Sequence, residues 1–240
     1  MITIKTFVEG PIDANNYLVI DEDSKEAVLI DCSSARDEFI QAIKDSGVNL
    51  KQILLTHGHF DHLLGVDGFK EAFGVETCIS EDDMGQVRLV PDMLQMFLGM
   101  MGGSIPSIKN FVKDGDIIKI GNTEIKVIAT PGHTKGGMCY LVEDKLFSGD
   151  TLFQGSCGRC DLPEGDFGTI VKSIKEKVFT LPENVEVYPG HGPKTTIAHE
   201  KKFNEIINYW YNVILRRQVM RFFGGKERLR MTGKSRRISK

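Results

Sequence analysis

The sequence lacks any hydrophobic run long enough to cross a membrane. Its longest apolar candidate, Leu89 to Met101, is interrupted by Pro91, Asp92 and Gln95 and is shorter than the roughly 20 residues that a spanning helix needs. The first residues, Met1 to Lys5, have neither the basic region nor the cleavage site of a signal peptide. We therefore expect no membrane span and no secretion.

Cysteine is also scarce. The five cysteines are odd in number and scattered, which argues against a disulfide framework and predicts a cytoplasmic protein: they are Cys32, Cys78, Cys139, Cys157 and Cys160. The last two form a CxxC motif, but no second pair exists that could complete a zinc ribbon. Two interpretations of this pair stay open, small residues in a tight loop or a redox-sensitive pair close to the active site.

The charge is unevenly distributed, although the net charge is only −3. Residues 209–240 contain ten Lys or Arg against one acid, Glu227. At 240 residues, the chain fits one large domain, which we place at residues 1–208. Residues 209–240 are expected to form the end of the last helix and a basic tail. That tail is either a solvated end or a sequence-independent binder of anionic surfaces or nucleic acid.

Short strands alternate with helices along the chain, without internal repeats. The expected strands cover residues 2–8, 16–20, 27–30, 52–55, 117–120, 123–129, 138–142, 146–148 and 185–188. The expected helices cover residues 35–46, 65–73, 167–179 and 196 to about 211. The apolar segment 87–110 interrupts this order and, with Met84, holds five of the nine methionines. It is either a helical insertion packed on the body or an adaptable surface that covers the active site or another protomer.

Three of the six histidines, His57, His59 and His62, fall within six residues. Imidazole and carboxylate groups are the natural ligands of Zn²⁺, Fe²⁺ and Mn²⁺. His57 and His59 leave the end of an extended segment on the same side, because side chains alternate along a strand. Asp61 and His62 follow where the chain turns, so they can face a second position nearby.

The other candidate ligands each follow a predicted strand and lie next to a glycine. They are His133 in Pro131–Thr134, Asp150 in Gly149–Phe153 and His191 in Pro189–Gly192. Glycine permits the close backbone approach that a crowded metal centre requires. Loops at one edge of a sheet framework can bring such ligands together. His199, on the last predicted helix, remains as a structural residue.

These motifs, with Thr56–His62, resemble in order the ligand motifs of the metallo-β-lactamase-fold hydrolases, over about Ile2 to Asn208. The resemblance implies an α/β fold, an αββα sandwich of two mixed sheets with helices outside and metals at one edge. It implies two divalent ions, with zinc expected and iron or manganese as alternatives. The implied ligands are His57, His59 and His133 for the first ion, Asp61, His62 and His191 for the second, and Asp150 as the bridge between them.

The same resemblance implies a hydrolase that attacks a small acyl substrate with a hydroxide shared by the two ions, which lower the pKa of water and stabilise the transition state. Asp61 is assigned a second, catalytic role in orienting that hydroxide. Asp31, at the end of a predicted strand, either supports the ligands or caps a turn.

The segment Thr151 to Pro163 is similar to that of glyoxalase II-like hydrolases, which act on thioesters such as hydroxyacyl-glutathione. Arg159 there either binds a substrate carboxylate or pairs with Asp161 or Glu164. The chain lacks the long helical C-terminal region of glyoxalase II, so strict glutathione specificity is not expected. A mononuclear-iron persulfide dioxygenase and a lactonase are the alternatives within the fold. A nucleic-acid-binding or -processing protein is the alternative from another class, but 240 residues leave no room for the extra domain of nucleases.

Overall fold

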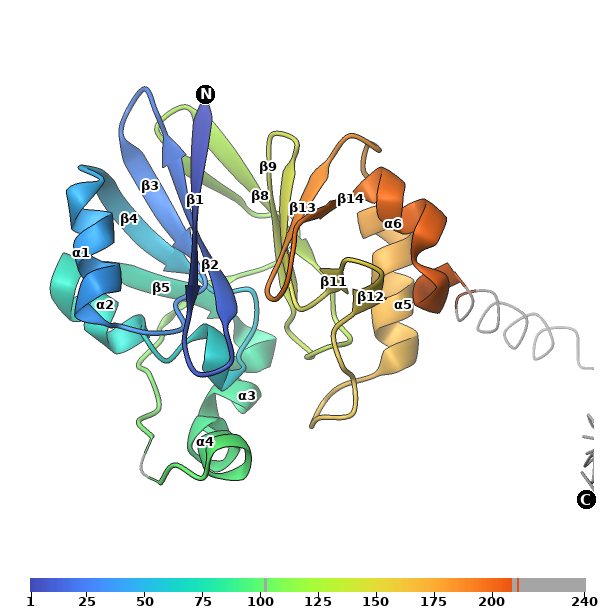
Figure 1. Ribbon diagram of the computed structural model, residues 1–240, viewed down its shortest axis with the longest axis horizontal. Coiled ribbons are helices and arrows are strands. Elements are labelled where there is room, and N and C mark those ends of the chain that lie inside the picture. The colour runs from blue at the N-terminus through green and yellow to red at the C-terminus, as the bar shows by residue number, and fades with distance from the viewer. Residues whose placement is uncertain (102, 209–210, 212–240) are drawn as a thin grey trace, which may run out of the picture.

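Two mixed β-sheets lie face to face, and helices cover their outer faces (Figure 1). This computed structural model describes residues 1–101, 103–208 and 211. The predicted α/β class and αββα arrangement are confirmed. The central strands are buried on both faces, as in the strand Ala14–Asp21, where every residue is buried. The two sheets therefore bury one face against each other and the other beneath helices.

The first sheet has six strands in the order of the sequence. They are β1 (Ile2–Glu9), β2 (Ala14–Asp21), β3 (Glu26–Ile30), β4 (Asn49–Leu54), β5 (Glu76–Ser80) and β6 (Asn110–Val112). The first three strands are antiparallel neighbours, whereas β3 to β6 run parallel. The parallel strands therefore end at one edge of the sheet, where the loop after β4 carries the histidine cluster.

The second sheet has the strand order β14-β13-β10-β9-β8-β7. Its strands are β7 (Ile117–Ile120), β8 (Thr123–Ala129), β9 (Met138–Val142), β10 (Lys145–Gly149), β13 (Glu186–Pro189) and β14 (Thr195–Thr196). Only β10 and β13 are parallel. A short hairpin of β11 (Leu152–Phe153) and β12 (Ser156–Cys157) follows β10.

Three hydrophobic clusters hold the layers together. One lies under α1 (Asp37–Asp45) and α2 (Val66–Phe73) and includes Phe39 and Phe69. The second lies between the sheets and includes Tyr140 and Phe147. The third lies under α5 (Phe167–Glu176) and α6 (Ile197–Phe203) and includes Ile170. Such burial, at about 25 cal/mol per Å² of apolar surface, is the main stabilising contribution.

The apolar, Met-rich segment begins as two short helices at the edge of the sandwich, α3 (Met84–Arg88) and α4 (Val90–Leu98) (Figure 1). Its residues 99–101 and 103–109 have no regular structure. Met93 and Leu94 are buried in the first cluster, whereas Met96 and Phe97 face outward. The segment therefore both packs on the body, as expected, and leaves an apolar surface open.

The expected continuous helix from residue 196 to 211 is wrong in one respect, because it is interrupted at Asn204. The Asn204 side chain donates to the Ser156 carbonyl at 3.0 Å and accepts from the Ile207 amide at 3.1 Å. It thereby ties the chain to the β11–β12 hairpin and begins a new helical turn. The predicted basic tail lies outside the described residues, as do residues 209 and 210.

Within the described ranges 1–101, 103–208 and 211, no helix has the length and hydropathy that crossing a bilayer requires.

Candidate metal centre

All seven predicted ligand residues meet at one edge between the two sheets. The loop after β4 contributes His57 and His59, and the short helix η1 (Phe60–His62) contributes Asp61 and His62. His133 follows β8, Asp150 follows β10 and His191 follows β13. The motifs that follow the strands therefore meet at one sheet edge, as expected, and residues up to 134 positions apart in the sequence form one cluster.

Their side chains divide into overlapping groups whose candidate ligand atoms lie within 4.8 Å of one another. One group is His57, His59 and His133, and another is Asp61, His62 and His191; a third group, His57, His62 and Asp150, shares a residue with each of them. Asp150 lies between the first two groups. Its Oδ1 is 3.4 Å from His62 Nε2, and its Oδ2 is 3.5 Å from His133 Nε2.

The donor set fits divalent cations. The Nε2 atoms of His57, His59 and His133 are buried and make no hydrogen bond to any described residue, and neither does Asp150 Oδ1. A buried polar atom without a partner is costly, by about 1–3 kcal/mol. Four such atoms facing one another indicate that an ion completes them, and imidazole with carboxylate is the chemistry that zinc, iron and manganese accept.

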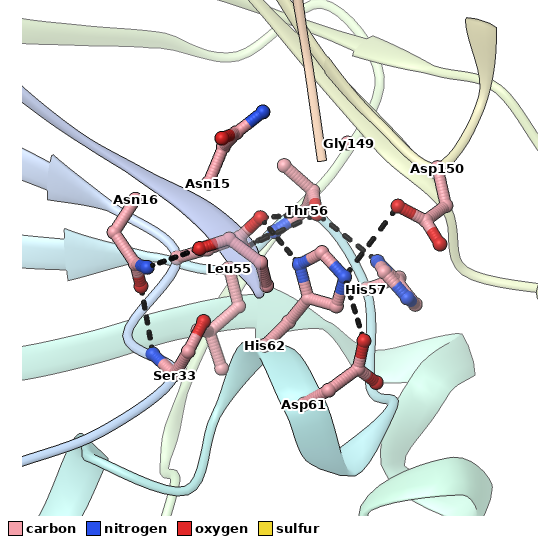
Figure 2. A network of polar contacts seen from close by, with 12 residues as sticks. Asn15, Asn16, Ser33, Leu55, Thr56, His57, Asp61, His62, Gly149 and Asp150 are labelled. Atoms are coloured by element: carbon pink, nitrogen blue, oxygen red, sulfur yellow. Dashed lines mark hydrogen bonds and ion pairs between the residues drawn. The ribbon is translucent and has the colours of Figure 1, made fainter. Parts of the chain in front are cut away.

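His62 is oriented by a carboxylate behind it. Asp31 Oδ2 lies 2.9 Å from His62 Nδ1, which leaves Nε2 directed toward Asp61 and Asp150 (Figure 2). The same carboxylate accepts from the Thr56 amide at 2.8 Å and from the Thr56 hydroxyl. Asp31 thus has the supporting contacts that one of its two interpretations required. Its backbone φ is +60°, in the left-handed region that Asp tolerates better than most residues.

Thr56 connects this carboxylate to the other group of ligands. Its hydroxyl lies 3.0 Å from His57 Nδ1, so Nε2 of His57 is the free ring nitrogen. On the third ligand, His133 Nδ1 donates to the Arg159 carbonyl at 2.6 Å. Both contacts leave Nε2 as the atom that faces the centre.

Asp83, which the sequence motifs did not reveal, joins two of the ligand loops. The buried carboxylate accepts from the Gly58 amide at 2.9 Å, the Thr134 hydroxyl at 2.7 Å and the Gly136 amide at 2.5 Å. Burial raises the pKa of Asp83, although the three hydrogen bonds act to lower it. No signal in the sequence pointed to Asp83, because β5, which precedes it, was not among the expected strands.

The His191 loop is held from the first sheet, by residues that were likewise missed. The Asn15 side chain donates to the carbonyls of Pro189 at 3.0 Å and Gly192 at 2.9 Å, and the Tyr17 hydroxyl donates to Pro189 at 2.6 Å. Gly190 has no room for a side chain, because a Cβ there would lie 2.2 Å from Asp150 Oδ1. Both sheets therefore contribute to the position of His191.

The electrostatics differ between the two groups of histidines. Although burial opposes it, Asp61 and Asp31 raise the pKa of His62, and the hydrogen bond with Asp61 raises the pKa of His191. Burial, reinforced by the neighbouring histidines, lowers the pKa of His57, and burial with His133 lowers that of His59 to about 3. Burial also opposes ionisation of Asp61, but His62 and His191 outweigh it and lower the pKa of this carboxyl. Neutral imidazole and carboxylate are the forms that bind a cation.

A cavity of about 440 Å³ opens onto the centre. Arg159 lines it, but its guanidinium is paired with both carboxylate oxygens of Asp161, at 2.7 and 2.8 Å. The surface ion pair considered as its alternative role is therefore present. Cys157 also lines the cavity. Burial raises the pKa of Cys157 to about 11 and that of Cys160 to about 12, so both thiols are protonated at neutral pH and the tight-loop interpretation is favoured.

The sandwich and the convergent histidines and carboxylates define a metallohydrolase class. The chain matches the Metallo-beta-lactamase superfamily over residues 10–191 and belongs to it. Among curated relatives, it is 36% identical to the hydroxyacylglutathione hydrolase GloC of Haemophilus influenzae, over 80% of this chain and 92% of the relative.

Solved structures of the same fold also resemble this chain. The BLEG-1 B3 metallo-beta-lactamase shares 33% identity at a TM-score of 0.79, covering 85% of this chain and 99% of that chain. TTHA1623 in a di-iron-bound form shares 29% identity at 0.74, with coverage of 83% and 98%. ETHE1 from Myxococcus xanthus shares 28% identity at 0.71, with coverage of 88% and 91%. The protein is therefore a metallo-β-lactamase-superfamily metallohydrolase with a His and Asp metal-binding cluster.

Proposed function

We propose that this protein hydrolyses acyl thioesters at a centre of two divalent metal ions. The observation that carries the metal chemistry is the convergence of the unpartnered Nε2 atoms of His57, His59 and His133 with Asp150. The similarity to GloC supports a thioester, with hydroxyacyl-glutathione as the reference substrate. Zinc is the proposed metal, and the di-iron form of TTHA1623 makes iron the alternative to test.

His57, His59 and His133 would hold one ion, and Asp61, His62 and His191 the other, with Asp150 shared by both. Bound there, the ions would lower the pKa of a shared water and polarise the acyl carbonyl. Asp61 Oδ2 lies 3.1 Å from His191 Nε2 and 3.3 Å from His62 Nε2. We assign Asp61 the further role of accepting a hydrogen bond from the attacking water and so fixing its direction.

The overall reaction adds water across the acyl–sulfur bond. A C–O bond forms at the acyl carbon as the C–S bond breaks, the electron pair leaves on sulfur, and the products are a carboxylate, a thiol and a proton. A thiol has a pKa of roughly 8.5 and leaves as a thiolate without a strong acid. This fits the cavity, where the titratable side chains outside the ligand set are Arg159 and Cys157.

The test combines metal content with a substrate panel. Elemental analysis of the purified protein should find two divalent ions per chain. Thioesters should then be hydrolysed faster than lactones or phosphodiesters, and Asp61→Asn should lower kcat by about 10²-fold or more, with the exposed Asp67→Asn as control. Full turnover by Asp61→Asn with both metals bound would remove its proposed role.

The ETHE1 likeness favours one competing function, the mononuclear-iron dioxygenase. A single iron per chain together with oxygen uptake on a persulfide substrate would establish that function instead. Binding of RNA that weakens with salt and is lost without residues 224–240 would point to a nucleic-acid role for the tail.

A further inference from the structure

The cavity beside the metal centre is apolar over most of its wall. Five members of the centre line its base. Six apolar side chains line the rest, together with Ser156, Cys157 and Arg159: they are Ile12, Phe60, Met93, Phe97, Phe153 and Leu162. A pocket with one reactive polar end and a long apolar wall fits a ligand that has a polar reactive group at one end and an apolar remainder.

The wall contains little to bind anionic groups. Arg159 is the one cation among the residues that line the described cavity, and Asp161 already occupies its guanidinium in a bidentate pair. The Arg159 guanidinium carbon also lies over the ring of Phe97, 5.9 Å from its centroid. The Arg159 side chain therefore packs against the apolar wall. Glutathione carries two carboxylates, for which this wall offers no unpaired cation.

Helix α4 provides the exposed part of the wall. The Phe97 ring stacks on Phe60 with centroids 5.9 Å apart, and Phe97 is still 42% exposed. Ile12, in the turn between β1 and β2, also lines the cavity and is 44% exposed. Apolar side chains that remain open at the rim of a reactive cavity are typical of a surface that substrate covers. Met93, which is buried one turn earlier on the same helix and also lines the cavity, has the flexible side chain that adapts to different shapes.

We infer that the preferred substrates are thioesters of an apolar, straight-chain acyl group, and that Phe97 and Met93 of α4 determine this preference. The inference rests on the proposed thioester hydrolysis and specifies its acyl group. The acyl carbonyl reaches the metal centre, and the alkyl chain lies along Phe60, Phe97 and Met93. A short hydroxyacyl group would leave this wall in contact with water.

The first measurement is a chain-length series on the metal-loaded enzyme. Acetyl, butyryl, hexanoyl and octanoyl thioesters of one small neutral thiol, N-acetylcysteamine, are compared with lactoyl-glutathione. We expect kcat/KM to rise about three- to fourfold for each added methylene until the wall is filled, the increment for burying one CH₂. Phe97→Ala should flatten this rise, so that the ratio of octanoyl to acetyl kcat/KM falls towards one. Met96→Ala, an exposed neighbour that does not line the cavity, should behave as the parent.

The second measurement does not depend on turnover. Affinities of the metal-loaded protein for butyrate, hexanoate and octanoate, measured by calorimetry, should rise with chain length in the parent and less in Phe97→Ala. A flat series in both experiments, or lactoyl-glutathione turned over faster than the hexanoyl thioester, would overturn the inference. Rising affinities without hydrolysis of any thioester would uphold the apolar site and reject the proposed reaction.

Discussion

The Asp83 carboxylate accepts a hydrogen bond from the Gly58 amide at 2.9 Å, and Gly58 separates the two ligands His57 and His59. The same carboxylate accepts from the Thr134 hydroxyl, next to His133. The loop that carries His57 and His59 and the loop that carries His133 are therefore both held by the same buried carboxylate. Such partners behind the ligands typically change metal affinity by about 10- to 100-fold.

Asp83→Asn should weaken metal binding at the His57, His59 and His133 position by that factor. The amide that replaces the carboxylate has one oxygen, so it cannot accept all three hydrogen bonds, and its NH₂ group meets donors. Competition with a chelator measures the affinity. Asp82→Asn is the matched control, because Asp82 is exposed and its carboxylate forms an ion pair with Lys135 at the surface. Equal metal affinity in the two variants would show that Asp83 is only a structural residue.

Asp31→Asn tests the support on the other side of the centre. Asparagine also tolerates the left-handed backbone of this position (φ +60°), so the backbone is preserved while the charge facing His62 is lost. We expect about 10- to 100-fold weaker binding at the Asp61, His62 and His191 position. Asp31→Ala should bind metal no better and should lose additional stability from the backbone conformation. An unchanged second metal affinity in Asp31→Asn would contradict the orienting role.

Much of this site follows from local sequence, and the remainder depends on long-range contacts. His133, Asp150 and His191 each stand beside a glycine after an apolar strand, a pattern visible in the chain itself. Asp83 carries no such mark, because its partners are backbone and hydroxyl groups 25 to 53 positions away.

The fold shows the same division between local and distant causes. Most strands and helices lie where the pattern of apolar residues predicted them. The strands β5 and β6 were not among those expected, and neither was the break at Asn204. That break depends on the Ser156 carbonyl, which only the folded chain brings near. The role of Arg159 could not be predicted from the neighbouring sequence either. Both its ion pair with Asp161 and its position in the cavity lining are visible only in the folded chain.

Because the ligands are divided between two ions, different ligand variants should lose different metal ions. His133→Ala should retain one metal ion per chain, and His191→Ala should retain the other. Asp150→Ala should weaken both, because its two oxygens face His62 and His133 separately. Elemental analysis gives the number of ions, and the absorption of Co²⁺-substituted protein distinguishes the position that remains. His199→Ala is the control, since this histidine lies on α6 outside the centre. Loss of both ions in every ligand variant would contradict two separable positions.

Removing the metals should destabilise the fold as well as abolish activity. In the metal-free protein the buried Nε2 atoms of His57, His59 and His133 have no hydrogen-bond partner among the residues that the structure describes, and Asp61 and Asp150 lose the attraction of a cation. A ligand at 100 times its Kd stabilises by about 2.7 kcal/mol, so saturating Zn²⁺ should raise Tm by several degrees. Thermal unfolding with chelator, and after Zn²⁺ is restored, measures this. A Tm independent of metal would contradict the site.

A pair of glycine variants separates lack of space from backbone strain. A Cβ at Gly190 would lie 2.2 Å from Asp150 Oδ1 and 2.8 Å from His62 Cε1, whereas one at Gly192 would have no atom of the described residues within 4 Å. Gly192 has a φ of +74°, so Gly192→Ala should lose about 1–2 kcal/mol of stability and still bind both metals. Gly190→Ala should displace Asp150 and His62 and lose metal from both positions. Metal titration and thermal unfolding of the two variants give the comparison, and full metal binding by Gly190→Ala would show that Asp150 can move without loss of the centre.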